Sequence, residues 1–164
     1  MSNTDVLGAM LRYHGTSTAK LATLAEELTD AELDAPIEGY DRSIRASFQH
    51  VADTGWLWHA LFETGALPDF AEAPSGRLTT VPEIIGAFQA DHDWLEQWHS
   101  NASEDELNGA IEVHFPWAPA PASLPRWRIL TQVVLHGQQH RSEIALALTR
   151  FGKSPGEIDF LFES

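Results

Sequence analysis

Apolar side chains recur along most of this chain at the three- and four-residue spacing of amphipathic helices. Four long segments show the pattern, and Pro-, Gly- and polar-rich stretches separate them. The expected helices cover about Thr4 or Asp5 to Leu28, Asp41 or Ser43 to Thr64, Thr80 to His99, and Pro125 to Phe151. The pattern therefore predicts an all-α protein, a four-helix bundle with long crossover loops.

Local signals mark the ends of these segments. Capping boxes are expected at Thr29 and Thr80, and Gly65 and Gly152 stand where helices should end. Residues 65–79 have the composition of a crossover loop.

The region before the last helix has a different pattern. Ser103 opens a short turn, and residues 111–115 alternate as a small extended segment. A cluster of prolines should then hold the chain extended: Pro116, Pro119, Pro121 and Pro125.

Two short stretches resemble each other and suggest the layout of the helices. TDAELDAPIE (29–38) and SEDELNGAIE (103–112) share residues at matching offsets, and each follows one helix and precedes another. This echo predicts two helical hairpins of similar plan, packed so that their second helices face each other.

Two histidines, His136 and His140, lie one helical turn apart on the apolar face of the last helix. An isolated pair with this spacing is more often a pair of core or surface histidines. Burying two imidazoles together is unfavourable unless something pairs with them, and a shared metal ion does so. Gly137 leaves room for a ligand or a close neighbouring helix. The residue after His136 is not Glu, so the HExxH motif of zinc proteases is excluded.

Other histidines also fall on or near inner faces. His50 lies on the shoulder of the second helix and supplies what a three-histidine site would need. His14 faces inward from the first helix, either as a hydrogen-bonded core residue or as a residue lining a pocket. His92 is compatible with the core, the rim or the site. We expect neither His14 nor His92 to be a metal ligand.

Composition narrows the chemistry and the partners. The 164 residues, expected to form a single domain, carry 24 Asp and Glu against 10 Lys and Arg, a net charge of −14. Such a surface repels nucleic acid and anionic membranes. With no cysteine, a metal must be held by His, Asp or Glu. The first residues lack a signal peptide's pattern, and no apolar run is long enough to span a membrane, so a soluble cytoplasmic protein is expected.

The chain resembles the DinB-like (YfiT-like) four-helix bundle proteins. The resemblance rests on LRYHGTSTAKLATLAEELTDAEL, SIRASFQHVADTGWLW and, most specifically, VVLHGQQHRSEIALALTRFGKSPGEIDFL. It implies a divalent metal held by His50, His136 and His140. The tail should fold back onto the bundle through Phe160, Leu161 and Phe162.

Three histidine ligands would leave one to three positions open, as in catalytic sites. The resemblance implies a metal-dependent thiol S-transferase or a related detoxification or stress enzyme, with a low-molecular-weight thiol as co-substrate. Two alternatives remain: a non-catalytic metal- or ligand-binding stress protein, and a metal-dependent hydrolase. Asp53 and Glu143, each three residues from a ligand, are the candidate bases for hydrolysis.

The expected cofactor is zinc or nickel, with iron or manganese as alternatives. The catalytic group would be a metal-bound water or thiol, with His14 as a possible pocket residue. We expect a small-molecule substrate, and Trp56 and Trp98 near helix edges suggest a homodimer.

Overall fold

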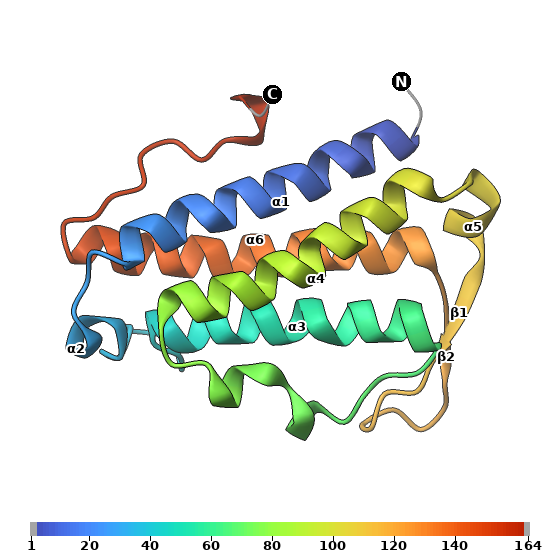
Figure 1. The fold of residues 1–164 in the computed structure, drawn as a ribbon, viewed down its shortest axis with the longest axis horizontal. Helices are drawn as coiled ribbons and strands as arrows, with labels where there is room; N and C mark the ends of the chain where they lie inside the picture. The colour runs from blue at the N-terminus through green and yellow to red at the C-terminus, as the bar shows by residue number, and fades with distance from the viewer. Residues whose placement is uncertain (1–2, 163–164) are drawn as a thin grey trace.

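The computed structural model describes residues 3–162 and places most of them in helices (Figure 1). In chain order the elements are α1 (Asn3–Ala25), α2 (Asp30–Leu33), α3 (Ile44–Thr64), η1 (Phe70–Glu72), η2 (Pro74–Arg77), α4 (Val81–Asn101), α5 (Glu104–Asn108), β1 (Ala110–Val113), β2 (Ala122–Pro125), α6 (Arg126–Arg150) and η3 (Phe160–Phe162). Within this range the long helices α1, α3, α4 and α6 form the expected four-helix bundle. No helix in the described residues combines the length and the apolar composition that crossing a membrane requires.

The order of the helices around the bundle differs from the expected pair of hairpins. α1 packs mainly against α6 and α4, and α3 packs against the same two helices. Figure 1 shows α1 and α3 on opposite sides of the bundle, with α6 and α4 between them. The prediction that α3 and α6 are neighbours is right, but consecutive long helices α1 and α3 do not pair. The 26–43 connection, which contains α2, is long enough to carry the chain across the bundle's end.

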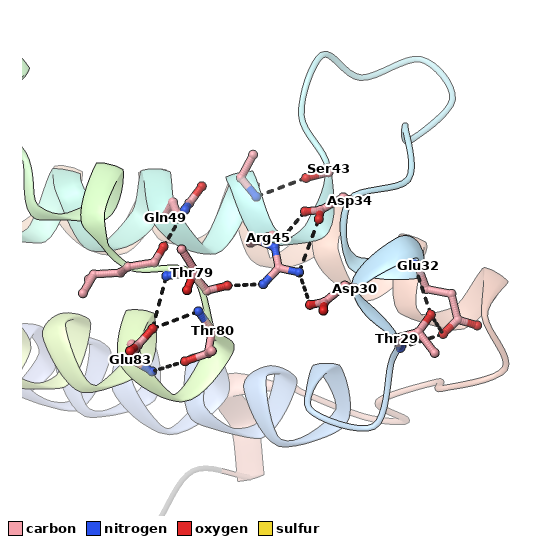
Figure 2. Close-up of polar contacts among 12 residues, drawn as sticks. Thr29, Asp30, Glu32, Asp34, Ser43, Arg45, Gln49, Thr79, Thr80 and Glu83 are labelled. Atoms are coloured by element: carbon pink, nitrogen blue, oxygen red, sulfur yellow. Dashed lines mark hydrogen bonds and ion pairs between the residues drawn. The ribbon is translucent and has the colours of Figure 1, made fainter.

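The capping boxes predicted at Thr29 and Thr80 are confirmed, and a third one occurs at Ser103. In α2, α4 and α5 the hydroxyl before the helix accepts a backbone N–H while a Glu carboxylate accepts the cap residue's own N–H. The pairs are Thr29 with Glu32, Thr80 with Glu83, and Ser103 with Glu106. Figure 2 shows the first two of them. Ser43, one of the two expected candidates, caps α3, and Gly65 ends it with a φ of 78°.

A small hairpin follows α5 at one end of the bundle (Figure 1). β1 and β2 pair antiparallel, with Ile111 opposite Leu124. Ile111 and Val113 point their side chains into the core, so this hairpin covers the ends of the helices. The sequence predicted the extended β1 segment and the extended proline stretch, but not their pairing.

The core has two apolar halves with a polar layer between them. One half lies around Phe48, Phe88 and Ile144, and the other around Leu61, Leu95 and Leu130. Each long helix contributes to both halves. The layer between them contains the buried polar side chains His14, His92, His140 and Arg141. A polar layer at this depth must be held by hydrogen bonds or by a ligand, which makes it the place to look for function.

The C-terminal tail returns to the bundle, as predicted, but only in part. The hydroxyl of Tyr13 donates to the carbonyl oxygen of Ile158 at 2.7 Å, and the Phe160 ring meets the Tyr13 ring edge-on at 5.4 Å. Leu161 is 78% exposed, so the expectation that it packs on the bundle is wrong. The side chain of Phe162 lies outside the described part of the structure.

Candidate metal centre

The structure brings His50, His136 and His140 together. His50 comes from α3, and the other two come from successive turns of the neighbouring helix α6. The Nε2 atom of His136 lies 3.2 Å from that of His50 and 3.1 Å from that of His140. One ligand atom from each residue lies within 4.8 Å of the other two. His140 is buried, and the other two rings are half-buried at the open side of the cluster.

These separations fit ligands of one metal ion. Two nitrogens about 2.1 Å from one ion, at an angle of about 90–109°, lie about 3.0–3.4 Å apart. Both Nε2 pairs that involve His136 fall in this range. Hydrogen bonds alone satisfy the cluster poorly, because a protonated Nε2 of His136 could donate to only one of its two neighbours. The donor set therefore fits a divalent cation, although the role of the three residues as ligands stays a prediction.

The far side of His140 is held by two residues. Its Nδ1 lies 2.8 Å from a carboxylate oxygen of Glu143 and 2.8 Å from the Tyr40 hydroxyl. The carboxylate is an acceptor, so Nδ1 of His140 carries the proton and Nε2 presents its lone pair to the cluster. A carboxylate behind a histidine is the usual outer support of a metal-ligating imidazole.

Two of the histidines resist protonation. Burial, then the neighbouring Arg42, His136 and His140, lower the pKa of His50 to about 4. Burial, then His140 and Arg42, lower the pKa of His136 to about 4. Both imidazoles are therefore neutral well below pH 6.5, in the state that a metal ligand needs.

Neither candidate general base is free. Asp53 is buried, and its carboxylate accepts the backbone N–H of Ser75 at 3.1 Å and also the Ser75 hydroxyl. Glu143 is held by His140. Both carboxylates are therefore already hydrogen-bonded to another residue, Asp53 to Ser75 and Glu143 to His140.

His14 and His92 lie in the core, away from the cluster's open side. His14 is 2% exposed, and its Nδ1 accepts a hydrogen bond from the guanidinium of Arg141. Burial, followed by the charge of Arg141, lowers the pKa of His14 well below its usual value. His92 stacks on Phe88, with ring centroids 5.5 Å apart. The structure therefore gives His14 the role of a hydrogen-bonded core residue rather than a pocket wall, because Arg141 and the surrounding helices enclose it.

Sequence reasoning did not single out Tyr40, Arg42 or Arg141. Tyr40 and Arg42 stand in the connection before α3, where no periodicity indicates which side chains point inward. Arg141 directly follows His140, so its place in the motif was the available signal. Its guanidinium is fully buried, donates to Gln138 at 2.9 Å and lies 5.1 Å from the Tyr13 ring centre. Burial lowers the pKa of Arg141 to about 10, so it stays charged at neutral pH.

A sequence profile described as the DinB superfamily matches residues 15–144, which include all three clustered histidines. The chain belongs to the DinB superfamily. Among curated protein sequences, none matches it.

Two solved structures share the fold of this DinB superfamily chain. YfiT from Bacillus subtilis, described as "a probable metal-dependent hydrolase with an unusual four-helix bundle topology", is 18% identical and superposes with a TM-score of 0.71. That match covers 94% of this chain and 91% of YfiT. A conserved protein from Enterococcus faecalis is 15% identical, with a TM-score of 0.63 over 90% of this chain and 96% of its own. At these identities the likeness establishes the fold.

Proposed function

We propose that this protein is a divalent-metal-dependent enzyme that transfers a low-molecular-weight thiol to an electrophilic small molecule. The observation that carries the proposal is the cluster of His50, His136 and His140. The pKa values of His50 and His136 are lowered, so both rings are neutral at neutral pH. The two candidate bases, Asp53 and Glu143, are hydrogen-bonded to other residues. Because both candidate bases are held in this way, the site suits a nucleophile that ionises readily.

The protein's own residues would hold and orient the ion. His50, His136 and His140 offer ring nitrogens, and Glu143 with Tyr40 fixes the ring of His140. When bound, a divalent ion on three neutral imidazoles would supply Lewis-acid chemistry that lowers the pKa of a thiol or water entering an open position. Zinc or nickel is the proposed occupant, with iron or manganese as alternatives.

The proposed reaction is a substitution at carbon. The thiol sulfur forms a bond to the electrophilic carbon while the bond from that carbon to its leaving group breaks. The leaving group departs with the electron pair, and the thiol proton passes to solvent. This balance needs no further oxidant or reductant.

Hydrolysis is the second candidate, and one observation favours it. YfiT, which shares the fold, is described as a probable metal-dependent hydrolase. In that case water, rather than a thiol, would be the nucleophile at the same three-histidine site. The hydrogen bonds of Asp53 and Glu143 weigh against it, because they make each carboxylate less available to accept a proton from water.

The test compares the two reactions on one preparation. Tag-free protein is loaded separately with zinc, nickel, iron(II) or manganese and assayed with several thiols against 1-chloro-2,4-dinitrobenzene, and without thiol against p-nitrophenyl acetate. Thiol-dependent release of chloride that needs the metal, and that His136→Ala abolishes and the exposed-site control His114→Ala retains, supports the transferase. Ester cleavage without thiol favours the hydrolase. Tight metal binding with neither reaction overturns both and favours a sequestering protein.

A further inference from the structure

A groove of about 460 Å³ leads to His136 between α3, the β1–β2 hairpin and α6. Its volume is in the range of about 300–1,000 Å³ that is usual for small-molecule sites. His136 lines it together with apolar and aromatic side chains, and with Arg128 and Gln132 from the preceding turns of α6. A molecule in this groove would therefore lie directly beside the three-histidine cluster.

Three aromatic rings form a continuous wall along this groove. Trp58 is buried on α3 and meets Phe115 edge-on at 6.5 Å. Phe115 in turn stacks on Trp117 at 5.1 Å with an interplanar angle of 28°. Trp117 is 79% exposed, so the wall runs from the core to solvent and ends in a large apolar surface. Flat apolar molecules bind well to such a wall, because rings stack on rings and lose water on both sides.

The groove also carries a positive charge at its edge. Arg128 lines it and is exposed, and none of the acidic side chains in residues 3–162 pairs with it. A free guanidinium at the edge of an apolar groove provides a fork of donors for a carboxylate or sulfonate.

We infer that the groove binds an aromatic or similarly flat apolar acid, and that this is the electrophilic substrate of the site. Its body lies on the wall of Trp58, Phe115 and Trp117, its anionic group lies on Arg128, and its other end reaches His136. The assignment as substrate rests on the proposed function. The binding of such a molecule does not, because it needs no metal.

The experiment uses two fluorescent probes that differ in charge. 1-Anilinonaphthalene-8-sulfonate has the proposed chemistry, and N-phenyl-1-naphthylamine is its neutral counterpart. Each is titrated into the full chain, metal-free and zinc-loaded. We expect one saturable site per chain, with Trp117→Ala weakening both probes about tenfold and Arg128→Gln weakening only the sulfonate about tenfold.

The matched controls replace exposed residues of the same two types that lie outside the groove. Trp127→Ala removes another exposed tryptophan and Arg12→Gln another exposed arginine, and neither residue lines the groove, so both should leave the two affinities unchanged. Circular dichroism verifies that each variant is folded. Equal binding of the sulfonate by wild type, Trp117→Ala and Arg128→Gln would overturn the inference. If the probes behave as expected but the protein binds no metal, the groove stands and the proposed function fails.

Discussion

At the scale of single residues, Gly137 and His14 share one small volume where α1 packs against α6. A Cβ atom built on Gly137 would lie 2.2 Å from Cε1 of His14. The sequence predicted that Gly137 leaves room for a ligand or a close helix. The structure gives that room to the His14 ring, and the guanidinium of Arg141 donates a hydrogen bond to that ring beside the glycine. The glycine is therefore needed for close helix packing under the cluster.

Replacing Gly137 by alanine should therefore destabilise the protein by about 1–3 kcal/mol, because the added methyl group overpacks the interface. Gly86→Ala is the control, since that helical glycine has nothing within 4 Å of its added Cβ and should gain up to about 1 kcal/mol. Urea unfolding measures both. Equal stability of the two variants would contradict the assigned contact, and His14→Ala should relieve the cost in the double variant.

The pKa values of His50 and His136, each lowered to about 4, predict how the stability of the metal-free protein depends on pH. In the unfolded chain these residues have pKa values of about 6.5. The metal-free protein should therefore lose stability as the pH falls from about 6.5 to 4, and these two residues should not change its stability above about pH 6.5.

The same two pKa values predict how many protons metal binding releases. In the folded protein both residues are already neutral at about pH 5.5. Metal binding at that pH should therefore release no more than about one proton per ion, whereas three ordinary histidines would release nearly three. Calorimetry in buffers of different ionisation enthalpy counts them, and a count near three would contradict these shifts.

The sequence could predict only part of this site. His136 and His140 share a helix, so their spacing alone places them on one face. His50 reaches them only through the packing of α3 on α6, and it stood out mainly through the resemblance to DinB-like proteins. Tyr40 and Arg42 lie in an irregular connection, where no local pattern indicates the direction of a side chain.

At the scale of elements, the helix ends could be predicted, because they depend on residues only a few positions apart in the sequence. The capping boxes and Gly65 set helix ends through local hydrogen bonds, and the structure has them where the sequence indicated. The pairing of β1 with β2 and the position of α1 diagonal to α3 depend on residues far apart in the sequence. Neither capping nor periodicity contains that information.

Arg45 joins three elements at one end of the bundle, as Figure 2 shows. It is largely buried on α3, contacts Asp30 at 2.6 Å and Asp34 at 2.7 Å, and donates to the carbonyl oxygen of Thr79 before α4. Arg45→Met should lower the free energy of unfolding by about 1–3 kcal/mol, because it removes charge-assisted hydrogen bonds and leaves the Thr79 carbonyl without this donor.

The matched control for this prediction is Arg150→Met. Arg150 makes an exposed contact of 3.8 Å with Glu38, and such surface pairs contribute about 0–1 kcal/mol. Thermal and urea unfolding compare the two variants. A loss at Arg150 as large as that at Arg45 would contradict the structural role of the Arg45 contacts.

At the scale of the whole molecule, the fold places a polar layer between two apolar halves and opens that layer to one side at the three histidines. Arg141 puts a buried positive charge into the layer, and no carboxylate in the described part of the chain pairs with it. Buried polar groups of this kind cost stability unless they are well bonded. In this bundle, buried polar side chains around the histidine cluster therefore replace apolar residues that would stabilise the core more.

An ion held by α3 and α6 together should stabilise the whole bundle. An ion that binds only the folded state raises the free energy of unfolding by about 2.7 kcal/mol when the free ion is at 100 times its dissociation constant. We expect the melting temperature to rise on adding zinc, to fall on adding a chelator, and to respond to neither in His136→Ala. An unchanged melting temperature of the wild type in both conditions would mean that no ion links the two helices.

The most direct test of the central claim is the equilibrium binding of cobalt(II) to tag-free protein, followed by absorbance. The account predicts one ion per chain, and a loss of affinity of at least about 100-fold in each of His50→Ala, His136→Ala and His140→Ala. His114→Ala should bind as the wild type does, and His14→Asn should bind within about tenfold of it. Wild-type protein that binds no cobalt, or a His14→Asn variant that loses the ion completely, would contradict the three-histidine site.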